Sequence, residues 1–438
     1  MRKLHCQSSP ARALICVSVF FLLGSFAGCG KSVPSELNGN EAQSAEPAPV
    51  NQPLNQATAG EPDSHELSRG ANKLDQEHDD GFFTRGQIPL VRITADPDAL
   101  RQLENDPRTF IRVDVQVDDV VYRDVGLHMK GRGGSFRSLN SKPGLTLKFN
   151  KFRKGQRFHG LEKIHLNNSV QDPSFMTEIL CGQMFRDAGV PAARATNARV
   201  QLNGRKLGFY VLVEGITEDF LQRYFENTQG NLYDFPYTHD ITSTAVKESK
   251  DRDPSDLRAL AAAAKEPDLA KRWERLGRVL DLDRFITYLA IEVSIWDWDC
   301  YAMCRNNYRV YHDPVTDKIV FMPHGMDQIF DNPKGSILPV MKGLVAKAVL
   351  ETSEGRRRYF EQIRVFMQSQ FTNERMTARV VELQNRIRPG LAEFNPNAVR
   401  KHDQAVIRLQ EHIEQRILSV QKQVASPPEK PVRSSHFP

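Results

Sequence analysis

The chain has 438 residues, of which 40% are hydrophobic, so it is long enough for two or three domains and at least one sizeable core. Its formal net charge is +5, and its basic residues do not gather in blocks interleaved with aromatic residues. A mildly basic body suits an anionic substrate, but this composition argues against a nucleic-acid-binding protein.

Residues 1–29 are predicted to be an export signal. Basic residues precede an apolar run over 13–27, which is too short for a comfortable transmembrane span. The run ends at Phe26-Ala27-Gly28-Cys29, which resembles a bacterial lipobox in which Cys29 carries the lipid. Because Phe26 stands where an aliphatic residue is usual, cleavage by the ordinary signal peptidase is the alternative. We expect an exported protein that is lipid-anchored to the cell envelope through Cys29, or otherwise secreted.

Residues 30–85 are predicted to be a disordered acidic linker. The stretch 31–80 has no aromatic residue and is rich in Pro, Ala, Asn, Gln and Glu, so it cannot bury enough apolar area to offset its chain entropy. At the other end of the chain, residues 426–438 are expected to form a disordered tail.

The body contains three cysteines, Cys181, Cys300 and Cys304. One pair of them could be oxidised in an exported protein, but three thiols make no disulfide framework. Cys300 and Cys304 lack a nearby pair of histidines and make a poor zinc site.

The first part of the body has the alternating pattern of β-strands. Val113, Val115 and Val117 recur at every second position, and an Asp118-Asp119 turn leads into a second strand that ends near Met129. We therefore expect an antiparallel meander.

A glycine-rich loop from Lys130 through Arg132 to Ser135 follows this meander. It lacks the Gly-Lys-Ser/Thr ending of a Walker phosphate-binding loop, so an ordinary β-turn is its simplest interpretation. The next strand places Leu145, Leu147 and Phe149 on one face, and Thr146 and Lys148 on the other.

A helix is predicted between Asp172 and Gly189. Asp172 is the expected N-cap, Pro173 the first helical residue, and Gly189 the residue that ends the helix. Glu178 lies beside the apolar stripe of this helix, from which its carboxylate could reach a lysine on a strand. A hairpin follows, with an Asn203-Gly204 turn and a second strand that ends at Glu214.

From Ser255 onwards the pattern is helical. We expect a helix capped by Ser255, a helix that contains Trp273, and a long apolar helix over 283–295. The sequence leaves open whether Glu292 on that apolar helix is buried or lies at its polar edge. The sequence 308–322 predicts a hairpin, and roughly 355–425 is helical and charged.

Three residues around this hairpin have the order of a kinase-like phosphotransferase. Asp299 follows the long helix, Asn307 comes eight residues later, and Asp327 stands at the exit of the hairpin. Such a site uses one carboxylate to accept or orient the acceptor hydroxyl, and oxygen ligands to hold a magnesium ion at the nucleotide phosphates. Each residue taken alone could be a turn or cap residue, so the interpretation depends on their common order. His324 is expected to be a structural, hydrogen-bonding histidine.

Several segments resemble the spore-coat-protein-H kinase family. They lie between about residues 90 and 335: Phe158–Asn168, Asp172–Ser174, Phe185–Pro191, Leu207–Glu214, Asn306–Tyr311 and Met326-Asp327. The resemblance implies an atypical protein-kinase fold that uses ATP and a divalent metal, Mg²⁺ or Mn²⁺. Some members of the family phosphorylate serines of surface-layer proteins.

The resemblance also implies roles for individual residues. Asp299 would be the catalytic aspartate, with Asn307 and Asp327 as the metal ligands. The nucleotide would be bound by Lys148 on its phosphates with Glu178 as the ion-pair partner, by Glu214 near the adenine-side connection between the lobes, and by the basic loop of Lys130, Arg132 and Ser135.

We therefore expect an α+β protein with an atypical two-lobed protein-kinase-like fold. Its β-rich N-lobe would span residues 86–217 and its mainly helical C-lobe residues 218–425. The expected function is ATP- and metal-dependent phosphoryl transfer to Ser or Thr of an envelope protein, with no nucleic-acid partner. The alternatives are a non-catalytic surface adhesion or assembly protein that keeps the fold, and AMP or glutamyl transfer by the same site.

Overall fold

The computed structural model describes residues 81–433, except 243–245 and 248–252. The expected export signal, lipobox and most of the linker lie outside the described residues. The described part is a mixed α+β unit, β-rich in its N-terminal part and mainly helical in its C-terminal part. Within it, no helix is both long and apolar enough to cross a membrane.

The N-terminal part is a closed barrel. Its strands are β1 (Leu90–Ala95), β2 (Ile111–Val117), β3 (Val120–Lys130), β4 (Gly144–Lys148), β5 (Lys163–Asn167), β6 (Ala195–Leu202) and β7 (Arg205–Glu214). Strands β1 to β3 form the expected antiparallel meander, β4 and β5 continue it beyond the predicted part, and β7 pairs with β5. The barrel closes because β6 also runs parallel to β1, a pairing between distant segments that no local pattern predicts.

The expected inward faces of the strands are confirmed. Val113, Val115 and Val117 are buried in the barrel, as are the three apolar residues at 145, 147 and 149. Phe82 and Phe83 are also buried in this core, although they were assigned to the linker. The folded body therefore begins by residue 81, because two aromatic side chains just after the acidic stretch find an apolar site against the barrel.

Three short helical elements lie between the strands of the barrel in the sequence: α2 (Pro97–Asn105), the 3₁₀ turn η1 (Gly133–Ser135) and α3 (Thr177–Asp187). Helix α3 begins later than expected, so the prediction of Pro173 as its first residue was wrong. Phe175 has a left-handed backbone (φ 59°), which interrupts a helix, and the Asp172 carboxylate instead accepts bonds from the backbone N–H groups of Met176 and Thr177. Gly189 ends the helix at φ 77°, as expected.

The C-terminal part combines a four-stranded sheet with helices. The strands, in sheet order, are β11 (Lys318–Pro323), β10 (Tyr308–Asp313), β8 (Asn231–Asp234) and β9 (Val246–Lys247). The helices are α4 (Glu218–Leu221), α5 (Ser255–Ala264), α6 (Leu269–Val279), α7 (Leu282–Ser294), α8 (Tyr301–Cys304), α9 (Leu344–Glu351), α10 (Ser353–Ser369), α11 (Asn373–Phe394) and α12 (Pro396–Ala425). The expected hairpin and long helices are confirmed, but Ser255 is the first residue of α5 and not its cap.

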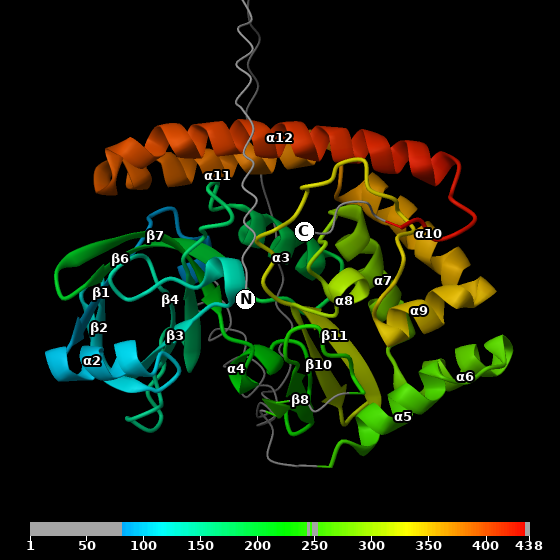
Figure 1. The fold of residues 1–438 in the computed structure, drawn as a ribbon, viewed down its shortest axis with the longest axis horizontal. Coiled ribbons are helices and arrows are strands. Elements are labelled where there is room, and N and C mark those ends of the chain that lie inside the picture. The colour runs from blue at the N-terminus through cyan, green and yellow to red at the C-terminus, as the bar shows by residue number, and fades with distance from the viewer. Residues whose placement is uncertain (1–80, 243–245, 248–252, 434–438) are drawn as a thin grey trace, which may run out of the picture. The chain divides into compact units, whose positions relative to one another are not determined.

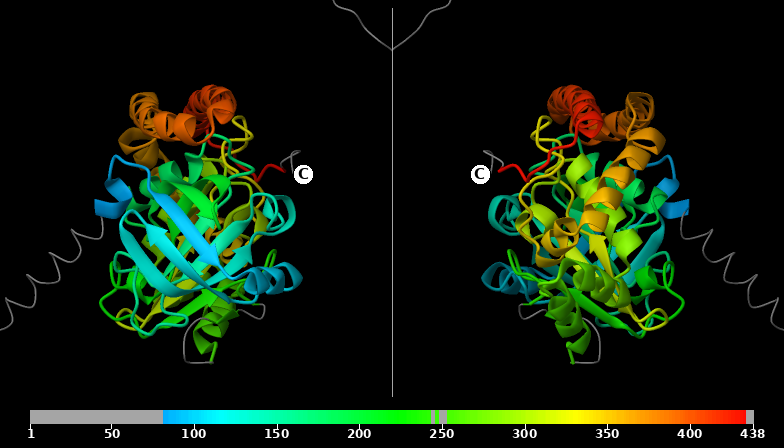
Figure 2. Two further views of the ribbon diagram at one scale, coloured as in Figure 1. Left: turned by 90° about the vertical axis from the view of Figure 1, so that its left-hand side faces the viewer. Right: turned by 90° about the vertical axis from the view of Figure 1, so that its right-hand side faces the viewer.

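Helices α11 and α12 lie side by side across both the barrel and the helical part (Figure 1). The chain beyond α12 turns back onto the body, where the Val432 N–H donates to the Leu338 carbonyl (2.9 Å). The prediction of a disordered tail from 426 was therefore wrong as far as Val432, and residues 434–438 lie outside the described part. In Figure 2, the left view looks onto the barrel and the right view onto the helices on the other side.

Helix α7 runs through the core of the C-terminal part. Every residue from Phe285 to Ser294 is buried, and this includes Glu292 at 1% exposure. The open question about Glu292 is thus settled in favour of burial, which raises the pKa of its carboxyl to about 8. The three body cysteines, also buried, are free thiols.

We predict that Glu292→Gln changes the pH dependence of stability. The folded-state pKa of Glu292 lies above its unfolded value, so its contribution is fully present below about pH 4.5 and is lost as the pH rises through about 8. The free energy of unfolding of the wild type should fall relative to that of the variant by up to about 1.4 kcal/mol for each pH unit in this window. Urea unfolding of both proteins between pH 5 and 9 measures it. Parallel pH profiles would contradict the burial of an ionisable carboxyl here.

Candidate active site

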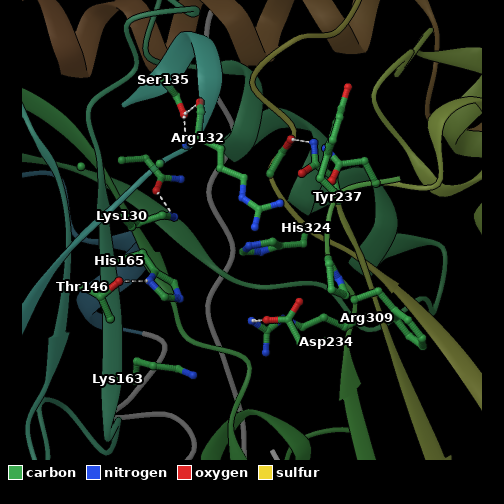
Figure 3. Close-up of a pocket in the computed structure, with 18 of the residues that line it drawn as sticks. Lys130, Arg132, Ser135, Thr146, Lys163, His165, Asp234, Tyr237, Arg309 and His324 are labelled. Carbon is green, nitrogen blue, oxygen red and sulfur yellow. Dashed lines mark hydrogen bonds and ion pairs between the residues drawn. The ribbon is translucent and has the colours of Figure 1, made fainter. Parts of the chain in front are cut away.

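One large cavity, of about 1540 Å³, lies where the barrel faces the sheet of the C-terminal part. The barrel contributes the loop after β3 and the ends of β4 and β5, and the other part contributes segments near residues 217–237, 298–309 and 324–328. Figure 3 shows Lys130, His165 and Lys163 on the barrel side, facing Tyr237, His324 and Arg309. The cavity therefore collects polar side chains from distant parts of the chain.

Lys130 is the barrel lysine that approaches the carboxylates of the site. Its ammonium group donates to Asn167 Oδ1 (2.6 Å), and Asn167 Nδ2 donates to Glu178 Oε2 (2.6 Å). The side chain passes over Gly144, where a Cβ atom would lie 3.2 Å from Lys130 Cγ. Burial lowers the pKa of Lys130, whereas the charges of Glu178 and Asp327 raise it. Asn167 thus connects the lysine of β3 to the carboxylate of α3.

The expected ion pair between Lys148 and Glu178 is absent from the described structure. Lys148 instead faces Glu162, with 3.8 Å between Nζ and Oε1. In the β3–β4 register Lys130 lies opposite Gly144, so Lys148 is four residues away along the strand, or roughly 13 Å. Lys148 lines the cavity at a different place. The strand pattern identified the correct face for Lys148, but which end of the strand meets α3 depends on the register.

The glycine-rich loop lies at the edge of the cavity. Arg132 and Ser135 close a tight turn, in which Ser135 Oγ donates to the Arg132 carbonyl (3.0 Å) and accepts from its N–H (3.2 Å). Gly131 has φ 108°, a conformation that favours glycine. Asn168 Nδ2 fixes the loop from below by donating to the Ser135 carbonyl (2.9 Å). All three predicted loop residues, Lys130, Arg132 and Ser135, line the cavity.

Asp299 and Asn307 lie together on the opposite wall. Asp299 Oδ2 accepts from Nδ2 of Asn306 (2.9 Å) and of Asn307 (3.0 Å), and Asn307 Nδ2 also donates to the Gly325 carbonyl (3.0 Å). Burial raises the pKa of Asp299, while the amide hydrogen bonds act in the opposite direction. Asp299 Oδ1 is buried and has no hydrogen-bond partner within the protein.

Asp327 completes this group on the loop after β11. Burial, together with the nearby charge of Glu178, raises the pKa of Asp327 to about 7, and Lys130 opposes this shift. The structure thus brings Lys130, Glu178 and Asp327 into one electrostatic cluster beside Asp299 and Asn307. Among the described residues, no three His, Cys, Asp or Glu side chains form a metal-binding group by themselves.

Glu214 is not among the residues that line the cavity. It is 1% exposed, and its carboxylate accepts from Arg194 Nη2 (3.0 Å) and Arg223 Nη2 (2.6 Å). Although burial raises its pKa, Arg223 and Arg194 together hold the pKa of Glu214 below its usual value. The side chain thus fixes the connection between the barrel and α4, and the expected role of Glu214 in nucleotide binding stays a prediction.

Among the cavity-lining residues that sequence reasoning did not assign to the site are Lys163, His165, Asn167 and Arg309, and His324 lines the cavity as well. His165 Nδ1 shares a hydrogen bond with Thr146 Oγ1 (3.0 Å), and the His165 and His324 rings lie 6.2 Å apart. Burial, together with nearby cations, holds the pKa of both histidines well below its usual value. The period-two placement of residues 163, 165 and 167 on β5 was the available signal, because it puts them on one face.

Comparison with known proteins gives a consistent family. A family model described as CotH kinase protein matches residues 129–419. Inner spore coat protein H of Bacillus subtilis (strain 168) is 23% identical over 359 residues, covering 76% of this chain and 96% of that protein. Invasin CotH3 of Rhizopus delemar is 24% identical over 270 residues, covering 52% of this chain and 43% of that protein. The match thus spans nearly all of the bacterial relative but less than half of the fungal one.

Among solved structures, the Helicobacter pylori proinflammatory kinase CtkA matches with 8% sequence identity. The alignment covers 69% of this chain and 97% of that chain, with a TM-score of 0.28.

We predict that Glu214→Gln destabilises the protein by about 3 kcal/mol, because it removes the buried carboxylate that pairs with Arg194 and Arg223. The control is Glu382→Gln, which breaks an exposed pair with Arg379 and should cost at most about 1 kcal/mol. Denaturant unfolding at pH 7 measures both.

The difference in stability between the wild type and Glu214→Gln should also depend on pH. Because the folded pKa of Glu214 is depressed, its stabilisation is present above the unfolded pKa of about 4.5 and is lost as the pH falls through the folded value. The difference between wild type and Glu214→Gln should therefore shrink in acid. A difference that stays constant down to pH 3 would contradict the ion-pair assignment.

Proposed function

The chain belongs to the CotH kinase protein family, and from this premise we propose that it is an atypical, two-lobed kinase that transfers phosphate from ATP to Ser or Thr of an envelope protein. The membership confirms the resemblance expected from the sequence motifs. The observation that carries the proposal is the arrangement of Lys130, Asp327, Asp299 and Asn307 around one cavity, with Glu178 behind its wall and joined to Lys130 through Asn167. In this proposal the barrel is the N-lobe and the helical part is the C-lobe.

Each of these residues has a definite chemical task. Lys130, held by Asn167 and Glu178, offsets the negative charge of the nucleotide phosphates. Asp299 orients the acceptor hydroxyl and accepts its proton, while the acceptor oxygen bonds to the γ-phosphorus and the bond from that phosphorus to the β–γ bridging oxygen breaks. The two amides that donate to Asp299 Oδ2 fix its carboxylate at the cavity wall.

The oxygen atoms on this wall fit a hard divalent cation. Asn307 uses its amide nitrogen for two hydrogen bonds within the protein, which leaves its Oδ1 for a cation, and Asp327 is a half-buried carboxyl with a pKa raised to about 7. Asn307 and Asp327 would therefore hold Mg²⁺ or Mn²⁺. Such a cation neutralises phosphate charge and orients the phosphates for transfer.

The proposed location is the cell envelope or the outside of the cell. The apolar N-terminal run and the Cys29 motif support export with a lipid anchor, and the Bacillus subtilis relative is described as a spore coat protein. The fungal relative described as an invasin supports the second candidate function, a non-catalytic surface protein that keeps the fold for binding. AMP or glutamyl transfer by the same residues is the third.

One experiment separates these functions. The purified protein is incubated with ATP and Mn²⁺, alone and with an envelope extract, and the products are analysed by intact-protein and peptide mass spectrometry. A phosphate adduct on Ser or Thr supports the proposal. An AMP or glutamate adduct would replace it with the third function, and the absence of any adduct together with the absence of nucleotide binding would favour the binding protein.

We predict that Lys130→Met lowers the transfer rate by about 10²–10³-fold, because the site loses the positive charge that faces the phosphates. Lys148→Met is the matched control, since it removes the same group from the cavity wall at the position paired with Glu162. Its rate should stay close to that of the wild type. Rates measured with radiolabelled ATP test this, and the opposite ranking would return the phosphate role to Lys148.

We predict that Asp299→Asn and Asp327→Asn separate catalysis from metal binding. Asp299→Asn should still bind the nucleotide with Mn²⁺ but lower the transfer rate by about 10²–10⁴-fold, the usual scale for a general base. Asp327→Asn should lose the part of nucleotide binding that depends on the metal. Thermal shift with ATP, with and without Mn²⁺, reports binding. A wild-type metal-dependent shift in Asp327→Asn would exclude Asp327 as a ligand.

A further inference from the structure

The segment from Ile295 to Asp299, called the catalytic segment below, begins where α7 ends, and this helix end is held by a residue from α12. The last carbonyls of α7, those of Val293 and Ser294, accept from Arg416 Nη2 (2.7 Å) and Nε (2.8 Å). Carbonyls in the last turn of a helix have no partner within the helix, and a cation there also interacts favourably with the helix dipole. Arg416 therefore caps α7 from a position more than a hundred residues later in the chain.

The same guanidinium group also holds the loop that follows Asp327. Its Nη1 donates to the carbonyls of Pro333 (3.2 Å) and Gly335. Along this loop the Phe330 N–H donates to the Ile295 carbonyl (3.0 Å), directly after α7. Arg416 thus joins the backbone just before Asp299 to the backbone just after Asp327.

Trp296 fills the space under this guanidinium. The Arg416 guanidinium carbon lies 5.4 Å from the centre of the Trp296 ring, and Trp296 has a left-handed backbone with φ 50°. A Cβ atom at Gly335 would lie 2.1 Å from the Trp296 ring, so only glycine allows this packing. The strained turn into the catalytic segment is therefore held on both sides.

The burial of Arg416 has no compensating carboxylate. Its side chain is fully buried, and no ion pair among the described residues includes it. Burial lowers the pKa of Arg416 to about 9. A buried cation that has only backbone carbonyls and an aromatic ring as partners is costly, and apolar packing would serve a merely structural core position better.

The neighbouring helix connects this arrangement to the barrel. On α11, Arg386 Nη2 donates to Asn197 Oδ1 of β6 (3.1 Å), and Glu393 pairs with Arg199 (2.9 Å). Helices α11 and α12 lie together across both parts of the body (Figure 1). The pair of helices α11 and α12 thus contacts two distant parts of the body. Helix α11 contacts strand β6 of the barrel, and α12 contacts the end of α7, which leads to Asp299.

We propose that Arg416 is a positioning residue, which holds the segment of Asp299 and the loop of Asp327 in a fixed mutual arrangement. It touches neither nucleotide nor acceptor and acts only through the backbone of Val293, Ser294, Pro333 and Gly335. The kinetic consequence rests on the proposed kinase function, but the structural consequence does not.

The structural test is hydrogen–deuterium exchange on the full chain. Arg416→Met should speed exchange in peptides that cover 293–301 and 327–337, and leave those of β2 and β3 unchanged. Arg408→Met is the control, because Arg408 is an exposed arginine on the same helix. Unchanged exchange in both segments, or an equal increase in the barrel strands, would overturn the proposal. If Arg416→Met does not fold, Arg416→Lys decides in the same way, since one ammonium cannot span both pairs of carbonyls.

The kinetic test uses the same variants with ATP and Mn²⁺. Arg416→Met should lower kcat by about 10²-fold with little change in KM for ATP, because displaced catalytic groups affect the transition state more than nucleotide binding. Arg416→Lys should recover part of this loss. A variant with wild-type kcat overturns the proposal. A wild type without any transfer instead refutes the kinase function, and exchange then decides on Arg416 alone.

Discussion

The buried charge of Lys130 is the constraint on which the candidate site depends. A lysine in this position is stable only if opposite charge and hydrogen-bond acceptors surround it, and Glu178, Asp327 and the amide of Asn167 supply them. Because these partners come from α3, β5 and the loop after β11, satisfying one cation fixes three elements relative to the end of β3. The geometry of the site is thereby tied to the stability of the fold.

Keeping the carboxyl groups of Glu178 and Asp327 buried in one cluster costs free energy. Burial raises the pKa of both Glu178 and Asp327, the charge of Glu178 raises that of Asp327 further, and a single lysine compensates for them only in part. A divalent cation at Asp327 and Asn307 would relieve this imbalance. The same reasoning distinguishes this cluster from Glu214, whose charge is compensated by two arginines.

The walls of the cavity are held from outside by residues that do not face it. Glu214 fixes the connection after the barrel, and Arg416 fixes the backbone on either side of Asp299 and Asp327. Both are fully buried charges at junctions between elements. For the binding-protein alternative such support would have no catalytic purpose, so the effect of these residues on transfer rates, compared with their effect on folding, bears directly on the function.

Local pattern was sufficient for much of this protein. Alternation at Val113, Val115 and Val117, the Asn203-Gly204 turn and the apolar run of α7 are short-range signals, and all were confirmed. The order of Asp299, Asn307 and Asp327 also identified residues that the fold does bring to one cavity. Backbone conformation and burial depend on neighbouring residues in such segments, so the sequence alone determines them.

Only the tertiary structure decided which distant residues meet. Glu178 contacts Asn167, which binds Lys130 and not Lys148, because strand register and the missing Cβ of Gly144 select the end of the sheet that faces α3. The barrel closure between β1 and β6, and the reach of Arg416 to the end of α7, join segments about a hundred or more residues apart. No local propensity encodes such contacts, since their free energy comes from packing and charge compensation that exist only once the chain has folded.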